Sequence, residues 1–223
     1  MPTSASRRWG AGTAAIARLL IGATGPVTGV ALARGASVTQ PRASQVLAQL
    51  AAHGAVRHTE RGYVARRAAL LDLYAARARP LLLGAETWWH APGSPADAAR
   101  AVVAAAERAG VALALSADVA SECLLGRPRA AVAVAYTRER LALDTPFTPV
   151  PGPAGATLAL RWTSDATLLS PAAPWPASCE GLPLTDPVHQ WWDLVDLAGD
   201  ERDEAASALR RAILDRSLPG GCG

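Results

Sequence analysis

Polar side chains recur at helical spacing between residues 37 and 52. On a helix, one face of this segment carries the apolar side chains and must be buried: Ala43, Val46, Leu47 and Leu50. The opposite side carries the polar ones: Arg42, Ser44, Gln45 and Gln49. Arginine can donate two hydrogen bonds to guanine, and glutamine can pair with adenine. The pattern therefore predicts a helix whose outward side reads base edges in a major groove.

The beginning of this helix carries further polar groups. Either Ser37 or Thr39 is expected to cap it, with Pro41 in its first turn, and the helix should end at Gly54. Thr39 and Gln40 could contact phosphate oxygens or base edges there, helped by unpaired backbone amides. The alternative interpretation is an ordinary helical hairpin with a polar, solvated face.

A basic hairpin is predicted directly after this helix. Residues 55–59 and 63–66 are short β-like stretches, and residues 60–62 form the turn between them. Arg57 would place a cation beside the DNA backbone, and Arg61 could enter the minor groove or hold a phosphate. Arg66 and Arg67 flank the same hairpin.

Two helices are predicted before the polar one, over residues 13–22 and 27–34, after a frayed basic arm over residues 1–12. A further helix over 68–79 leads to Pro80. The order of elements over residues 13–66 resembles the winged helix-turn-helix of multiple-antibiotic-resistance-type regulators. This resemblance implies binding to double-stranded DNA.

Charge is unevenly distributed along the chain. Residues 1–80 have a formal balance of +9, whereas residues 81–223 have a balance of −6. A basic module joined to an acidic one is typical of proteins in which only one part binds nucleic acid. We therefore expect a DNA-binding domain over 1–80, a second domain over 81–217 and a flexible tail over 218–223.

The second domain mixes helices and strands. Helices are predicted over 95–110, 118–125, 187–198 and 201–214, and strands over 111–115, 130–136, 157–162 and 166–169. Residues 144–157 should form a loop or hairpin, and residues 171–187 a proline-rich connection. The predicted class is α+β, with a mixed α/β carboxy-terminal domain.

Short motifs in this domain resemble a known family. Residues 185–194 read TDPVHQWWDL, and Arg202, Glu204, Ala205 and Ala206 follow on the next predicted helix. With the preceding module, they resemble the AbiEi family of antitoxins from type IV toxin–antitoxin systems, although Asp200-Glu201 replaces the usual glycine-rich turn. The resemblance implies a repressor that binds inverted repeats in its own promoter as a monomer or homodimer. It also implies neutralisation of a nucleotidyltransferase-like toxin without a stable complex.

Two other interpretations concern the second domain. It resembles a degenerate nucleotidyltransferase fold, but the strand over 130–134 carries no carboxylates to hold magnesium, so we expect no catalysis, metal or cofactor. Alternatively, Trp88-Trp89 and Trp191-Trp192 could line a ligand pocket, with His90, His189 and Asp193 as polar contacts, as in a ligand-responsive repressor. Otherwise each tryptophan pair divides between core and an interdomain surface.

The cysteines give the expected compartment. Cys123, Cys179 and Cys222 are odd in number, far apart and without metal-ligand spacing. No secretory signal precedes them, and the apolar run over 14–21 is interrupted by Arg18 and too short to span a membrane. We therefore expect a cytoplasmic protein with reduced thiols and no membrane contact.

Overall fold

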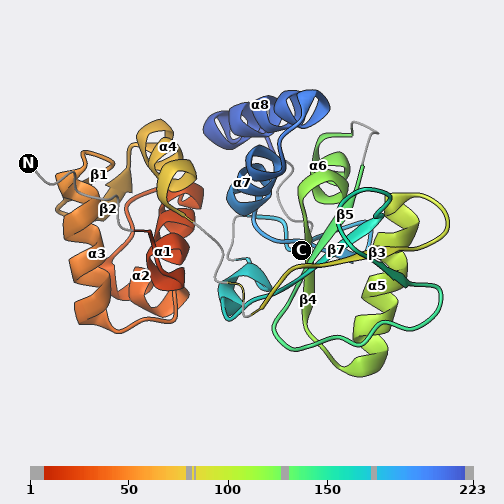
Figure 1. The fold of residues 1–223 in the computed structure, drawn as a ribbon. Helices are drawn as coiled ribbons and strands as arrows, with labels where there is room; N and C mark the ends of the chain where they lie inside the picture. The colour runs from red at the N-terminus through yellow and green to blue at the C-terminus, as the bar shows by residue number, and fades with distance from the viewer. Residues whose placement is uncertain (1–7, 79–81, 83, 127–130, 172–174, 219–223) are drawn as a thin grey trace, which may run out of the picture. The chain divides into compact units, whose positions relative to one another are not determined.

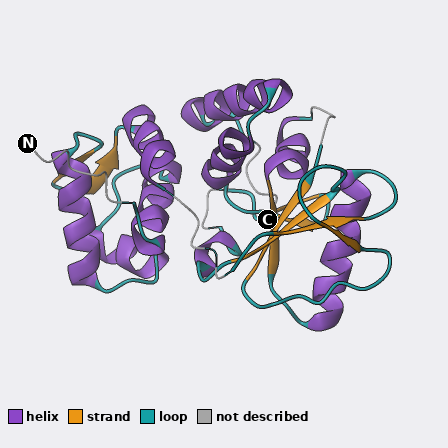
Figure 2. Cartoon of the chain, in the orientation of Figure 1, coloured by secondary structure: helices purple, strands orange, loops and turns teal. Residues whose placement is uncertain are grey.

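The computed structural model describes residues 8–78, 82, 84–126, 131–171 and 175–218. Its contacts divide the chain into two compact units, Met1–Leu81 (unit 1) and Leu82–Gly223 (unit 2). Both units combine helices and strands, so the protein belongs to the α+β class (Figures 1 and 2).

Unit 1 has three helices, a two-stranded hairpin and a fourth helix, in the order predicted. The elements are α1 (Ala11–Gly22), α2 (Gly29–Gly35), α3 (Gln40–Ala52), β1 (Val56–Thr59), β2 (Gly62–Ala65) and α4 (Arg67–Arg77). In Figure 1 the hairpin lies at one edge of the helices. The largest buried side chains are contributed by all four helices: Ile16, Leu20, Ile21, Leu32, Leu47, Leu50, Leu70, Leu71 and Tyr74. These apolar faces form the core of the unit.

The turn between α2 and α3 differs from the prediction in its cap. Thr39 is the N-cap residue of α3 and Pro41 lies in the first turn, as predicted, but the Thr39 side chain makes no capping hydrogen bond. Ser37 is not a cap. Its backbone has a φ of 53°, a left-handed conformation that reverses the chain between the two helices.

A third extended segment, which the local sequence pattern does not predict, pairs with the hairpin. Val27 pairs with Tyr63 of β2: the Val27 N–H donates to the Tyr63 carbonyl at 3.0 Å, and the Tyr63 N–H donates to the Val27 carbonyl at 2.8 Å. The predicted helix over 27–34 therefore begins later, at Gly29, where Thr28 caps it by accepting from the Ala31 N–H. Pairing with a distant strand overrides the local helical pattern at Val27.

The prediction of a frayed arm is wrong for residues 8–12. The Trp9 N–H donates to the Arg77 carbonyl at 3.0 Å, and the Trp9 ring packs edge-on against Tyr74 with centroids 6.2 Å apart. Helix α1 already begins at Ala11. An aromatic contact with the distant α4 orders this segment, and residues 1–7 lie outside the described part of the chain.

Unit 2 is built on a five-stranded mixed sheet. The strand order is β4 (Leu113–Ser116), β5 (Ala133–Thr137), β7 (Leu158–Trp162), β3 (Thr87–His90) and β6 (Thr148–Val150). Neighbours β5 and β7 are parallel, and the other pairs are antiparallel. Side chains alternate along each strand, so the sheet has two different faces.

Helices cover both faces of this sheet. Helices α5 (Pro95–Ala109) and α6 (Ala117–Leu125) pack their apolar side chains on one face, against residues such as Leu115, Ala135 and Leu158. Helix α7 (Pro187–Leu197) contacts the other face through Asp193, and α8 (Asp200–Asp215) packs on α7. These four helices lie within a few residues of the predicted ones.

Several elements of unit 2 differ from the prediction. Strand β3 was not predicted. The strand predicted over 166–169 is instead a 3₁₀ turn, η1 (Ala166–Leu168), because Asp165 accepts the Thr167 N–H at 3.0 Å and caps the turn. The segment 144–157 includes strand β6. The proline-rich connection contains a small hairpin of β8 (Ser178–Cys179) and β9 (Leu182–Pro183).

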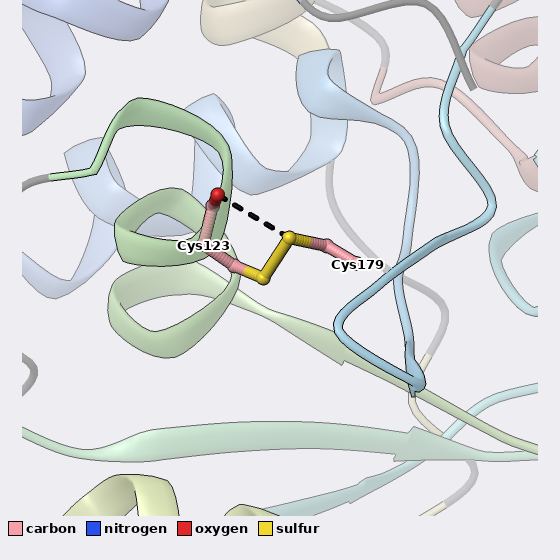
Figure 3. The surroundings of a disulfide bond; sticks show 2 residues. All are labelled: Cys123 and Cys179. Atoms are coloured by element: carbon pink, nitrogen blue, oxygen red, sulfur yellow. Dashed lines mark hydrogen bonds between the residues drawn. A yellow bond between two sulfur atoms is a disulfide. The ribbon is translucent and has the colours of Figure 1, made fainter. Parts of the chain in front are cut away.

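The prediction of reduced thiols is contradicted for two of the cysteines. Cys123 on α6 and Cys179 on β8 form a disulfide, with Cα atoms 6.2 Å apart (Figure 3). The fold brings together two residues that are 56 positions apart, which their spacing in the sequence does not reveal. Cys222 and most of the predicted tail lie outside the described residues. Among the described helices, none is both long and apolar enough to cross a membrane.

Candidate nucleic-acid interface

Helix α3 buries the face that the sequence analysis predicted. Ala43, Val46, Leu47 and Leu50 are each at most 2% exposed. The six polar residues that were predicted to contact DNA from this helix and its N-cap are all exposed: Thr39, Gln40, Arg42, Ser44, Gln45 and Gln49. Burial of the apolar stripe therefore fixes which side of α3 faces solvent.

The outward side of α3 is available for an external partner. Within the described part of the chain, the side chains of Ser44, Gln45 and Gln49 make no hydrogen bond. Ala48 is also exposed and adds no bulk between them. A ridge of small and polar side chains of this kind fits the width of a major groove.

Arg42 points away from the centre of that outward side. Its Nη2 donates a hydrogen bond to Thr13 Oγ1 of α1 at 3.4 Å. The reason is helical geometry: Arg42 and Gln49 are seven residues apart and share one flank of α3, whereas Gln45 lies between that flank and the side opposite the core. The structure thus places Arg42 apart from Gln45, although the sequence pattern grouped them.

The hairpin presents two unpaired cations. Its turn is closed by Thr59, whose hydroxyl donates to the Gly62 carbonyl at 2.8 Å, and the His58 ring packs on Tyr63 with centroids 4.7 Å apart. Arg57 and Arg61 are exposed and make no hydrogen bond or ion pair with the described residues. Their guanidinium groups are therefore available for a polyanion.

Arg67 has a different role from the one its position suggested. Its Nε donates to the Ile21 carbonyl at 3.0 Å, and its Nη2 donates to the Ala23 carbonyl at 2.8 Å. These carbonyls belong to the carboxy-terminal end of α1, where a cation is favourable. Arg67 caps α1, and the exposed Arg66 remains at the end of the hairpin.

Unit 2 contains a buried polar network that the sequence did not reveal. The Asp193 carboxylate accepts hydrogen bonds from three side chains: Ser116 on β4, Tyr136 on β5 and Arg161 on β7. Arg161 also donates to the Tyr136 hydroxyl at 2.9 Å and pairs with Glu86. Asp193, Ser116 and Tyr136 are fully buried, so the network binds α7 to the sheet rather than meeting a ligand.

Burial shifts the pKa values of two residues in this network. Loss of hydration raises the pKa of Asp193, although the Arg161 guanidinium and the three hydrogen bonds act in the opposite direction. Burial and the nearby Asp193 charge raise the pKa of Tyr136 well above its usual value. The phenol therefore remains protonated in the folded protein at neutral pH.

One of the two tryptophan pairs does not divide as predicted. Trp191 and Trp192 are only 6% and 4% exposed, so both belong to the interior, and Trp192 stacks on His189. Trp88 and Trp89 are half-buried neighbours on β3, where side chains alternate between the two faces, and Trp89 packs against the core of unit 2. His189 lies 3.6 Å from Asp193, and these two predicted polar pocket contacts are in the protein interior, whereas the third, His90, is exposed.

Within the residues that the structure describes, no group of three or more His, Cys, Asp or Glu side chains could hold a metal ion. Strand β5, on which a nucleotidyltransferase would carry its carboxylates, reads AVAYT. No model of a known protein family matches the chain, and no curated protein or solved structure matches it.

Proposed function

We propose that unit 1 is a winged helix-turn-helix that binds duplex DNA, and that the protein is a sequence-specific transcriptional regulator. Helix α3 would enter the major groove, with Ser44, Gln45 and Gln49 toward the base edges and Thr39 and Gln40 near its amino-terminal end. The β1–β2 hairpin would follow the adjacent backbone as the wing.

One observation carries this proposal. Burial of the apolar stripe of α3 leaves a continuous polar side with Ser44, Gln45 and Gln49 exposed and without partners among the described residues. A polar face that only solvates an ordinary helix needs no basic hairpin after it, whereas here Arg57 and Arg61 are also exposed. Groove contacts and backbone contacts are the two requirements of DNA recognition.

The arrangement of the elements supports the same proposal. A helix, a short extended segment at Val27, two more helices and a hairpin that pairs with Val27 follow one another in unit 1. The charge balance of +9 over residues 1–80 favours association with a polyanion, and the balance of −6 over the remainder directs that association to unit 1.

We further propose that the regulator is an autoregulating repressor and antitoxin of an AbiEi-like system, on the motif resemblance in residues 185–206. Footprinting on the DNA upstream of its own gene is expected to protect inverted repeats. A nucleotidyltransferase-like toxin encoded beside it is expected to arrest growth when expressed alone. Co-expression of this protein with that toxin is expected to restore growth. Growth arrest that the protein does not relieve would contradict the antitoxin role, but it would not contradict the proposal of DNA binding.

The test of DNA recognition is selection from a random duplex library, followed by affinity measurements on selected and random duplexes. Gln45→Ala is expected to weaken binding to the selected duplex by about 1–3 kcal/mol, and binding to random duplexes much less. Arg211→Ala, at an exposed position on α8, is the control and should change neither affinity. Failure to enrich any sequence would contradict sequence-specific binding, and equal losses on both duplexes would contradict base reading by Gln45.

A further inference from the structure

A basic cavity of about 280 Å³ lies within unit 1, beside the outward side of α3. It is formed by the segment before α1, by one flank of α3 and by α4. The residues around it are Arg8, Trp9, Gly10, Thr13, Arg42, Gln49, Leu50, His53, Leu73 and Arg77.

The charge of this cavity is of one sign. Among the described residues that line it, three are arginines, one is a histidine and none is acidic. Within the described part of the chain, the Arg8 and Arg77 guanidinium groups make no hydrogen bond or ion pair, and Arg42 contacts only the neutral Thr13 hydroxyl. Guanidinium groups that share a small cavity repel one another unless an anion is bound between them.

The cavity is built by ordered contacts. The Trp9 N–H bonds to the Arg77 carbonyl, and the Trp9 ring packs on Tyr74, so Arg8 is held beside α4. On the other side, the bond to Thr13 directs Arg42 from α3 toward α1. Arginines from three separate segments therefore converge on one space.

We propose that this cavity binds one phosphate group, and that in the DNA complex it is a backbone phosphate beside the groove that α3 enters. The inference rests on the proposed function. A guanidinium group can donate a pair of hydrogen bonds to the oxygens of a phosphate, and a cavity lined by three guanidinium groups suits one phosphate group. A free phosphorylated small molecule presents the same chemistry and is the other possible source of the group.

This assignment changes the role expected of Arg42. As a phosphate ligand, Arg42 fixes the position of α3 on the duplex, while Ser44, Gln45 and Gln49 remain the side chains toward the base edges. Its replacement should weaken binding to all duplexes by the same factor. A base-reading arginine would instead lose affinity mainly for the selected sequence.

The experiment replaces Arg77, which lies on α4 outside the recognition helix, and uses Arg8→Gln as a second variant. Arg77→Gln is expected to lower affinity for selected and random duplexes equally, and to reduce the slope of log affinity against log salt by about 1. Arg211→Gln on α8 is the matched control. A methylphosphonate scan of the selected duplex should find one position at which neutralising the phosphate weakens the wild type and leaves Arg77→Gln unaffected.

A second arm needs no DNA. Inorganic phosphate is titrated into the full chain while the amide resonances of Trp9, Gly10 and Thr13 are followed, and saturable shifts that disappear in both variants are expected. Such shifts with an unchanged salt slope would assign the cavity to a free phosphorylated ligand. If the wild type binds no DNA, the proposed function fails and the titration still tests the cavity. Unchanged salt slopes in both variants, together with no saturable shift, would overturn the inference.

Discussion

The Tyr136 hydroxyl on β5 donates a hydrogen bond to the Asp193 carboxylate on α7 at 2.8 Å, in the interior of unit 2. The same carboxylate accepts a hydrogen bond from Arg161, which also donates one to the Tyr136 hydroxyl oxygen. A buried acid and a buried cation are thus joined directly and through a shared phenol. Removing any one member leaves the other buried polar groups with fewer hydrogen bonds in the interior of the unit.

Replacement of Tyr136 tests this network through its pH dependence. Tyr136→Phe is expected to lower the free energy of unfolding by about 1–3 kcal/mol at pH 7, because two buried hydrogen bonds are lost. The folded pKa of Tyr136 lies well above the unfolded value, so its contribution to stability is complete below pH ~10 and is lost as the pH rises further. Urea unfolding of the wild type should therefore show a steeper loss of stability above that pH than unfolding of the variant.

Tryptophan fluorescence can follow this transition, since six of the seven tryptophans belong to unit 2. Tyr63→Phe, on the hairpin of unit 1, is the control and should leave the alkaline slope of unit 2 unchanged. Parallel pH profiles for the wild type and Tyr136→Phe would show that folding does not raise the pKa of the Tyr136 phenol.

The disulfide predicts a defined thiol count. Denatured protein that has not been reduced should show one reactive thiol per chain, and three after reduction, because Cys123 and Cys179 are joined. Closing a loop of this length stabilises the folded state by about 4 kcal/mol in the chain-entropy description. A Cys123→Ser/Cys179→Ser double variant should lose stability of that order, and a count of three thiols without reductant would contradict the bond.

Local patterns were sufficient to predict most of unit 1. The four helices and the hairpin follow from apolar spacing, Pro41, Gly54 and the turn residues, which act within a few positions of one another. Val27 was placed in a helix because its pairing partner, Tyr63, is 36 residues away. In unit 2, β3 was missed because a strand of four residues that contains two adjacent tryptophans shows no alternation of apolar and polar residues.

The candidate site was predictable to a similar depth. Which side of α3 is exposed follows from the buried stripe, but the direction of Arg42 depends on Thr13 of another helix. The cavity beside it depends on the docking of Trp9 against Tyr74, 65 positions away. In the buried network, Asp193 is 77, 57 and 32 positions from Ser116, Tyr136 and Arg161, respectively. A single sequence does not reveal contacts between residues so far apart.

The wing predicts a separable electrostatic effect. Arg61→Gln is expected to weaken binding to every duplex and to reduce the salt slope by about 1, because one exposed guanidinium no longer displaces counterions from the backbone. Arg57→Gln should behave similarly, whereas Arg211→Gln on α8 should match the wild type. An unchanged salt slope in both hairpin variants would exclude a backbone contact by β1 and its turn.

The position of the hairpin depends on Gly62. Its φ is +129°, and a Cβ at this residue would lie 2.5 Å from the Val27 carbonyl oxygen, whose hydrogen bond to the Tyr63 N–H joins the hairpin to the segment before α2. Gly62→Ala is therefore expected to cost at least about 2 kcal/mol in the free energy of unfolding.

Gly54→Ala is the matched control, because Gly54 also has a positive φ, +68°, but a Cβ there would meet nothing within 4 Å. It should cost only about 1 kcal/mol, the strain of the left-handed conformation alone. Hydrogen exchange should separate the two variants further: the amides of Val27 and Tyr63 should lose protection in Gly62→Ala and keep it in Gly54→Ala. Equal destabilisation with protection retained in both would mean that the close approach to Val27 does not position the hairpin.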